Sequence, residues 1–228
     1  MVEYDQSIFS KFDRDDRPID AEPSLRAGAE RLSSASVKRL IDILGALIAL
    51  IVLSPLMALV AIIISIETAG FPLFRQRRTG LRGRVFVIYK FRSMRVCEDG
   101  DAIPQATRND GRVTDFGGFI RRTSIDELPQ LFNILKGDMS LSGPRPHALA
   151  HDRFYGAVVP HYHHRFLVKP GLTGLAQVNG LRGPTETIHA MSARVDADLE
   201  YIRRWSLWLD MKILVRTVVI FPTQPQAF

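Results

Sequence analysis

The chain has 228 residues, 46% of them hydrophobic, and a formal net charge of +6 at neutral pH. This length allows one compact core and one membrane element, and the positive charge favours anionic partners such as lipid headgroups, phosphorylated substrates or nucleic acid. The single cysteine, Cys97, excludes an internal disulfide, and no Cys/His spacing typical of a zinc site occurs. We therefore expect a reducing, cytosolic environment for the soluble part.

Four regions follow one another along the chain. Residues 1–36 are polar, mixed in charge and without sustained periodicity, so they are predicted to form a flexible leader. Residues 37–70 are predicted to form a membrane element, 71–223 a cytoplasmic catalytic domain and 224–228 a short tail. The expected fold class is α+β and mostly helical.

An apolar run from Ile43 to Ile66 holds no charged residue and is interrupted by Ser54 and Pro55. A straight helix of this length would be roughly 36 Å long and could cross a bilayer core. Proline removes a helical hydrogen bond and favours a bend, and basic residues prefer the cytoplasmic side. We therefore predict a re-entrant helix hairpin that dips into one leaflet and returns; a kinked transmembrane helix and a buried core helix are the alternatives. The flanking basic residues are Lys38, Arg39, Arg75, Arg77 and Arg78.

Two β-favouring stretches around Gly80 and Gly83 predict a small β-hairpin. This basic stretch suits anionic membrane lipids, because each exposed positive charge contributes on the order of 1 kcal/mol near a charged surface. Lys90 and Arg92 either point at a substrate phosphate or form the solvated face of a strand. The stretch has no acidic residue between 75 and 97, and its eight basic residues are at positions 75, 77, 78, 82, 84, 90, 92 and 95.

Beyond the hairpin, a polar connection over residues 96–112 is expected to be a loop, and the rest of the chain is predicted to be mainly helical. Gly137 is expected to end one helix in the left-handed conformation. The helices over residues 185–205 and 208–221 are predicted to lie at the membrane interface. Helices are predicted over residues 114–122, 125–136, 147–155, 185–205 and 208–221.

The motif RRTSIDELPQ places the adjacent carboxylates Asp126 and Glu127 just after Arg121 and Arg122. Ser124 and Glu127 match a capping box, which is the structural alternative. Arginines beside a carboxylate pair at a helix start instead favour an anion and metal site. An aspartate can attack phosphorus to form an acyl phosphate, while a neighbouring glutamate holds Mg²⁺ on the departing phosphate.

Further along, Arg145 stands between Pro144 and Pro146. The prolines restrict the backbone, so the guanidinium is presented in a fixed direction that suits bidentate contact with phosphate. A simple turn between two helices is the alternative.

Weaker signals come from the second half of the chain. His161, His163 and His164 form either a metal site or a solvated loop, and no carboxylate at matching spacing supports the metal. Asp198 and Asp210 are either a second acidic pair or surface charges on interfacial helices.

Taken in order, these segments resemble the bacterial sugar transferase family of monotopic phosphoglycosyl transferases. The resemblance covers residues 38–223 and is carried by KRLIDILGALIALIVLSPLMALVAI, FRQRRTG, YKFRSM, RRTSIDELPQLFNILKGDMSLSGPRP, KPGLTGLAQVNG and WSLWLDMKIL. It implies a re-entrant helix broken at Ser-Pro and a catalytic domain on the cytoplasmic face of the bacterial inner membrane. The segment VNGLRGPTET resembles members that transfer glucose or galactose phosphate.

The resemblance also implies a reaction. Asp126 would attack a UDP-sugar to give a covalent phosphosugar and release UMP, and undecaprenyl phosphate would then accept the sugar phosphate, a first step of exopolysaccharide synthesis. Glu127, with Asp126, would bind Mg²⁺. Arg121 and Arg145 match phosphate-contacting positions, and Lys90, Asp198 and Asp210 match recurrent polar positions.

Two other classes of function stay open at this stage. A non-catalytic membrane-surface adaptor would use only the basic hairpin and the amphipathic C-terminal end. Nucleic-acid binding is suggested by charge alone and lacks aromatic stacking platforms or a recognisable module, so we expect no nucleic-acid partner. A homodimer is possible.

Overall fold

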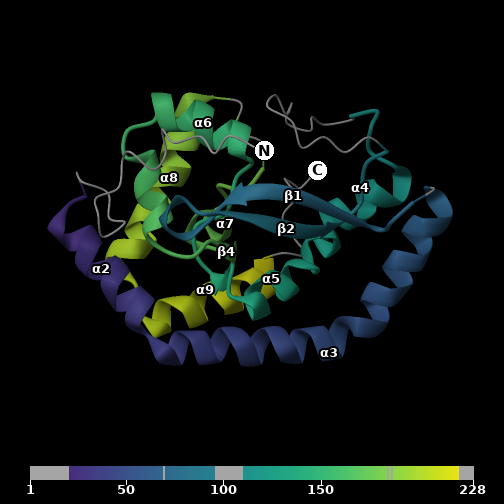
Figure 1. Ribbon diagram of the computed structural model, residues 1–228, viewed down its shortest axis with the longest axis horizontal. Coiled ribbons are helices and arrows are strands. Elements are labelled where there is room, and N and C mark those ends of the chain that lie inside the picture. The colour runs from purple at the N-terminus through teal and green to yellow at the C-terminus, as the bar shows by residue number, and fades with distance from the viewer. Residues whose placement is uncertain (1–20, 69, 96–109, 184, 186, 221–228) are drawn as a thin grey trace.

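The structure is a computed structural model that describes residues 21–68, 70–95, 110–183, 185 and 187–220. This part of the chain is α+β and mostly helical, as predicted (Figure 1). The tail at 224–228 and most of the predicted loop at 96–112 lie outside the described residues. The helices are α2 (Pro23–Ser34), α3 (Ser36–Glu67), α4 (Asp115–Arg122), α5 (Gln130–Lys136), α6 (Leu149–Val158), α7 (Leu175–Val178), α8 (Ile188–Arg204) and α9 (Leu207–Ile220). The 3-10 turns are η1 (Leu81–Gly83), η2 (Ile125–Glu127) and η3 (Tyr162–Leu167), and the strands are β1 (Leu73–Thr79), β2 (Val85–Phe91), β3 (Ser140–Ser142) and β4 (Gly171–Thr173).

The predicted membrane element is one helix, α3, which continues through Pro55. Pro55 has no amide hydrogen to donate to the carbonyl of Ile51, four residues earlier. The Ser54 hydroxyl donates to this same carbonyl oxygen at 2.9 Å. The Ser-Pro pair therefore removes one helical hydrogen bond and replaces it with a side-chain bond. The helix continues through Ser54 and Pro55, so the predicted break at this position is wrong. In Figure 1, α3 runs along the lower edge of the molecule and bends upward at the right-hand side, toward α4.

Both ends of α3 are attached to the same folded body. At the N-terminal end, the Asp42 carboxylate accepts hydrogen bonds from the Ser140 hydroxyl and the Leu141 amide at 3.0 and 2.9 Å. At the C-terminal end, the Glu67 carboxylate accepts a 2.7 Å bond from the hydroxyl of Thr114, the residue that caps α4. Between these ends α3 is long and apolar enough to cross a membrane, and only 11% of its most apolar 18-residue stretch is buried.

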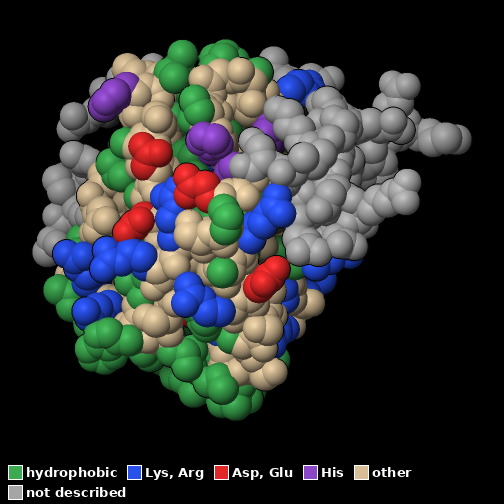
Figure 2. Space-filling view, turned by 90° about the vertical axis from the view of Figure 1, so that its left-hand side faces the viewer, with side chains coloured by type: hydrophobic (Ala, Val, Ile, Leu, Met, Phe, Trp, Pro, Cys, Tyr) green, Lys and Arg blue, Asp and Glu red, His purple; other side chains and the backbone are tan. Residues whose placement is uncertain are grey.

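The middle of α3 and much of α9 present apolar side chains to the outside. Figure 2 shows hydrophobic side chains gathered along the lower edge, the side on which α3 runs in Figure 1, with Lys and Arg side chains just above them. Such an apolar edge under a basic band suits a lipid surface. The most exposed of these apolar residues are Ile48, Ile51, Val52, Ile62 and Ile66 on α3 and Trp208, Val215, Val218 and Val219 on α9.

The prediction of a flexible leader through residue 36 is wrong from residue 23 onward, because helix α2 occupies this region. The sequence has an apolar stripe there, and Leu25, Gly28, Ala29 and Leu32 are buried. The backbone of α8 lies so close that a Cβ on Gly28 would be 2.2 Å from the carbonyl oxygen of Ile202. The stripe is only four residues long and is surrounded by charges, which is why its periodicity was too weak to predict a helix. Residues 1–20 lie outside the described part.

Strands β1 and β2 pair antiparallel from Leu73 opposite Phe91 to Thr79 opposite Val85, which confirms the predicted hairpin. The tight connection passes through Gly83, whose φ of 74° favours glycine. A second pair was not predicted: β3 and β4 form a short parallel ladder in segments for which no strand was expected. This ladder fixes the chain directly before Arg145.

Three apolar clusters form the core. One joins α2, η3, α8 and α9, a second joins the N-terminal half of α3 to β2 and α5, and a third joins the C-terminal half of α3 to β2 and α4. Since α3 contributes to two of the three, it is part of the folded body as well as of its apolar edge. The site described below lies on the elements that these last two clusters hold together.

Candidate active site

The acidic pair Asp126-Glu127 lies in the 3-10 turn η2, where a continuous helix from 125 to 136 was predicted. Pro129 explains the break, because it cannot donate to the Ile125 carbonyl; the amide of Leu128 bonds this oxygen instead, at 3.2 Å. The preceding residue, Ser124, has a left-handed φ of 55°, which is uncommon outside glycine. These two local departures turn the acidic pair into the interior. The predicted left-handed end at Gly137 is confirmed, with a φ of 91°.

Glu127 is held by two cations from different elements. Lys90 on β2 donates to Oε1 at 2.7 Å, and the Arg145 guanidinium bonds both carboxylate oxygens, with Nη1 to Oε2 at 3.0 Å and Nη2 to Oε1. The Ser124 side chain makes no capping bond and the Glu127 side chain faces these cations, so the capping-box alternative is wrong. Burial alone would raise the pKa of Glu127, but Arg145 and Lys90 together lower it well below its usual range. Glu127 is therefore a fixed negative charge at neutral pH.

Asp126 has the opposite environment. Its side chain is buried, yet none of the described residues donates a hydrogen bond to its carboxylate. Burial raises the pKa of Asp126 to about 6, against the attraction of Lys90 and with a further upward contribution from Glu127. A desolvated carboxylate without donors keeps its lone pairs available, and it is still ionised at neutral pH. These are the properties that a nucleophilic oxygen needs.

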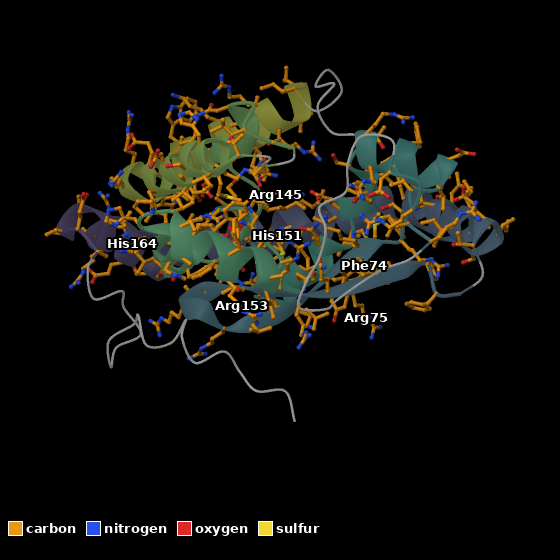
Figure 3. All side chains as sticks on the ribbon, turned by 90° about the horizontal axis from the view of Figure 1, so that it is seen from above. Phe74, Arg75, Arg145, His151, Arg153 and His164 are labelled. Carbon is orange, nitrogen blue, oxygen red and sulfur yellow. The ribbon has the colours of Figure 1, made fainter. Side chains whose placement is uncertain are left out.

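Arg145 is presented by a fixed strap, as its flanking prolines predicted. The carbonyl of Pro144 accepts from the Gly171 amide at 2.9 Å, and that of Arg145 accepts from the Arg165 guanidinium at 2.6 Å. The carbonyl of Pro146 accepts from Arg78 at 3.3 Å. Figure 3 shows Arg145 near the centre of the molecule, while Arg75 lies at the outer side of the hairpin.

The other predicted cations divide between two places. Arg121, in the last turn of α4, is close enough to Asp126 to lower the pKa of that carboxyl, although burial dominates it. Arg92 lies at the C-terminal end of α3, where it donates to the carbonyl and the hydroxyl of Thr68 at 2.8 and 2.7 Å. Lys90 and Arg92 were predicted together, but the structure brings only Lys90 to the acidic pair.

The remaining candidates are buried in separate places. Asp198 pairs with Arg165 at 2.8 Å, so it lies behind the strap that holds Arg145. Asp210 pairs with Lys38 at 2.8 Å, next to the start of α3. The two aspartates are therefore neither one acidic pair nor surface charges, and both alternatives offered for them are wrong.

Arg39 and the histidines serve the fold. Arg39 donates to the carbonyls of Ile134 and Leu135 at 2.7 and 2.9 Å, near the end of α5. His164 is buried within η3 whereas His161 is exposed, so the predicted solvated loop is wrong for His164, and no group of three or more metal-ligating side chains occurs among the described residues.

Sequence reasoning missed one cation at this site. Arg182, in the turn after α7, hydrogen-bonds the Ser124 hydroxyl, directly before the acidic pair. The signal that could have found it is the pair of glycines on either side, Gly180 and Gly183, which bracket an arginine in an otherwise unremarkable loop.

The acidic pair fits Mg²⁺ held jointly with a substrate. Oε1 of Glu127 accepts two of the hydrogen bonds described above and Oε2 one, so Oε2 and both oxygens of Asp126 keep free lone pairs toward the described residues. One or two carboxylates plus substrate phosphates are the ligands that Mg²⁺ takes in phosphoryl-transfer sites.

A long apolar helix on the edge and a buried carboxylate pair among cations are features of a membrane-associated enzyme that acts on anionic substrates. The bacterial sugar transferase family model matches residues 33–224, and the chain belongs to this family. It is 49% identical, over 93% of its length, to a UDP-glucose:undecaprenyl-phosphate glucose-1-phosphate transferase of Caulobacter vibrioides, covering 82% of that protein. It is 53% identical to a Xanthomonas campestris protein of the same name and 42% identical to a UDP-N-acetylgalactosamine-undecaprenyl-phosphate N-acetylgalactosaminephosphotransferase of Aeromonas hydrophila. The chain spans only 40% and 43% of the length of these last two relatives.

Proposed function

We propose that this protein transfers a hexose-1-phosphate from a UDP-sugar to undecaprenyl phosphate through a covalent aspartyl phosphosugar. The observation that carries the proposal is the contrast within the acidic pair: Glu127 is held by Lys90 and Arg145, while Asp126 is buried and accepts no hydrogen bond from a described residue. The names of the relatives support both substrates, with UDP-glucose as the first donor to test.

In the first displacement, an oxygen of Asp126 attacks the β-phosphorus of the UDP-sugar. The bond from this phosphorus to the bridging oxygen breaks, and UMP leaves with the electron pair. Lys90, Arg121 and Arg145 surround the position where negative charge accumulates, and fixed cations in a desolvated site stabilise such a transition state. Because the Glu127 carboxylate pairs with Lys90 and Arg145 in the free enzyme, these two cations are already oriented before the donor binds.

In the second displacement, a phosphate oxygen of undecaprenyl phosphate attacks the same phosphorus. The bond to Asp126 breaks, the carboxylate is regenerated, and the lipid carries the sugar as a diphosphate.

Glu127 and Asp126, together with the donor's diphosphate, would hold Mg²⁺, which supplies charge neutralisation to the UMP phosphate that departs in the first displacement. Splitting the transfer into two displacements lets one set of cations serve both phosphates in turn.

We further propose that α3 enters one leaflet and returns to the cytoplasmic face of the inner membrane, making the protein monotopic. Asp42 near one end and Glu67 at the other bind the same body, which supports both ends lying on one side. The apolar edge formed by α3 and α9 would rest in the lipid, with the basic hairpin near anionic headgroups.

The reaction is tested by UMP release from a panel of UDP-sugars, with undecaprenyl phosphate and Mg²⁺ in detergent. We expect release with at least one UDP-hexose, and its loss in Asp126→Asn. Asp196→Asn, which changes an exposed aspartate on α8, is the matched control and should behave as wild type. Unchanged release in Asp126→Asn would refute the nucleophile, and a wild type inactive with every donor would favour the non-catalytic adaptor.

Topology is tested in a variant without Cys97, with single cysteines placed at the exposed positions Ser34 and Arg84. A membrane-impermeant thiol reagent should label both only from the cytoplasmic side of sealed vesicles. Labelling from opposite sides would show that α3 crosses the membrane.

A further inference from the structure

The strap that carries Arg145 is held from behind by one buried side chain, Arg165. Its Nη2 donates to the carbonyl of Arg145 at 2.6 Å, and its Nη1 donates to Nδ1 of His147 at 3.1 Å. These two acceptors lie on either side of Pro146. A single guanidinium therefore holds the chain directly before and directly after this proline.

The Arg165 guanidinium is itself fixed on its remaining edge and on its face. Its Nε donates to Oδ2 of Asp198 on α8 at 2.8 Å, and the planar group lies over the Tyr162 ring, 5.0 Å from the ring centre. Burial and the neighbouring Arg165 lower the pKa of His147 well below its usual value, so the His147 ring is neutral and its Nδ1 can accept. Each of the three guanidinium nitrogens thus has an acceptor, and a rigid fork with three acceptors is held in one orientation.

Stability alone does not explain this buried ion pair. The side chains of Arg165 and Asp198 are only 2% and 1% exposed. Removing two charges from water costs free energy that their mutual attraction often fails to recover, and apolar residues in place of such a pair are often equally stable. An apolar pair, however, cannot donate a hydrogen bond to the Arg145 carbonyl. The ion pair therefore contributes a fixed direction more than it contributes stability.

This direction reaches the acidic pair through Arg145. Pro146 restricts Arg145 to extended backbone conformations, but it does not fix the carbonyl within that region. The hydrogen bond from Arg165 removes the remaining freedom at the base of the side chain, whose other end binds both carboxylate oxygens of Glu127. A displacement of about 1 Å in a group that binds the reacting phosphate can lower a rate about 100-fold.

We propose that Arg165 is a positioning residue of the transfer reaction, which together with Asp198 sets the direction in which Arg145 meets the substrate phosphate. This role rests on the proposed function and extends it. The hydrogen bonds of Arg165 go to Arg145, His147 and Asp198 and not to the acidic pair. Arg165 transfers no proton and acts on the reaction through Arg145.

The test follows the first displacement alone, using full-length protein in detergent, UDP-glucose, Mg²⁺ and no acceptor. The ion pair is replaced as a whole by Arg165→Met with Asp198→Leu, because either change alone would leave a buried charge unpaired. We expect this double variant to keep a thermal transition close to that of wild type and to release UMP about 100-fold more slowly in the first turnover. Arg204→Met changes an exposed arginine on α8 and should match wild type in both measurements.

The same replacement in an Arg145→Ala background shows whether the effect depends on Arg145. The guanidinium that the strap presents is already absent there, so the double change should slow UMP release by less than about threefold further. A full additional loss would contradict the positioning role, because it would show an effect that does not depend on Arg145. A wild-type rate in the folded double variant would overturn the proposal outright.

Arg165→Lys keeps the test decisive if the double variant has lost its thermal transition. Lysine retains the charge opposite Asp198 but cannot reach three acceptors at once, so we expect slower UMP release, and a rate within about threefold of wild type would overturn the proposal. A wild type that releases no UMP from any UDP-sugar would instead remove the proposed function itself. The variants alone, compared with an active wild type, decide the role of Arg165.

Discussion

Replacing Asp210 by asparagine is expected to lower the free energy of unfolding by about 3–5 kcal/mol, because it leaves a buried ammonium group without its counter-ion. The Lys38 and Asp210 side chains are each 6% exposed and lie 2.8 Å apart. Asp210 also accepts from the Tyr201 hydroxyl at 2.7 Å and from the Trp205 ring nitrogen at 3.0 Å. In asparagine one carboxylate oxygen is replaced by an NH₂ group, which cannot accept a hydrogen bond. At least one of the groups that donate to Asp210 would therefore face another donor.

The effect is measured by thermal unfolding in detergent, as a double-mutant cycle of Lys38→Met, Asp210→Asn and the double variant. For a chain of this size, about 3–5 kcal/mol corresponds to a fall in melting temperature of about 6–20 °C. The double variant should be more stable than the sum of the single losses predicts, with a coupling of about 2–3 kcal/mol, because it no longer buries an unpaired charge.

The exposed pair Arg204 and Glu200, with side chains 76% and 42% exposed, is the matched control. The same cycle there should give a coupling of only about 0.3–0.5 kcal/mol. Hydrogen-bond partners of Asp210 do not include the acidic pair, so folded Asp210→Asn should still release UMP at the wild-type rate below its melting temperature. The reasoning is refuted if the Lys38–Asp210 cycle is as small as the control, or if Asp210→Asn is inactive while fully folded.

Three further results are expected. Arg145→Lys should slow UMP release about 100-fold with little change in melting temperature, since lysine cannot make the two-pronged contact; a rate within threefold of wild type would count against it. Burial raises the pKa of Asp152 to about 6 from an ordinary 3.8, so the folded protein binds a proton that the unfolded chain does not, and stability falls as pH rises through this interval. In urea titrations, Asp152→Asn should therefore reduce the stability lost between pH 5 and pH 7.5 by about 1.4 kcal/mol, and an unchanged pH dependence would contradict the raised pKa. Chelation by EDTA should stop UMP release and added Mg²⁺ should restore it; full activity in EDTA would remove the metal from the mechanism.

The sequence predicts the elements of this fold better than their connections. The hairpin, α4, the end of α5 at Gly137 and the two C-terminal helices follow from alternation, capping and helical periodicity. The short ladder of β3 and β4 does not, because three-residue strands are fixed by tertiary hydrogen bonds rather than by a local pattern. For α2 the sequence does contain an apolar stripe, but the stripe alone is too short to predict a helix. The helix depends on burial of this stripe against α8.

The same distinction holds at the site. Asp126, Glu127 and Arg145 stand in motifs whose local chemistry is unusual, so they could be predicted from the sequence. Arg92 could not be separated from Lys90, because strand alternation places both on one face and only the position of Thr68 decides. The burial of Asp198 and Asp210 depends on partners far away in the chain, which no local pattern contains.

The continuous α3 also changes how Ser54 and Pro55 are understood. The sequence suggested a break, since proline removes one helical hydrogen bond, but the Ser54 hydroxyl replaces the missing donor at the Ile51 carbonyl. A bend that leaves no backbone carbonyl unsatisfied at this step is suited to an apolar surrounding, where an unpaired group is costly.

The most direct test of the central claim is intact-mass analysis of the protein after exposure to UDP-sugar and Mg²⁺ without a lipid acceptor. The account predicts a hexose-phosphate adduct that maps to the peptide containing Asp126, is absent in Asp126→Asn and disappears when undecaprenyl phosphate is added. A wild-type enzyme that turns over rapidly yet never carries the adduct, even when the reaction is stopped within one turnover, would contradict the covalent mechanism and require direct transfer between the two substrates.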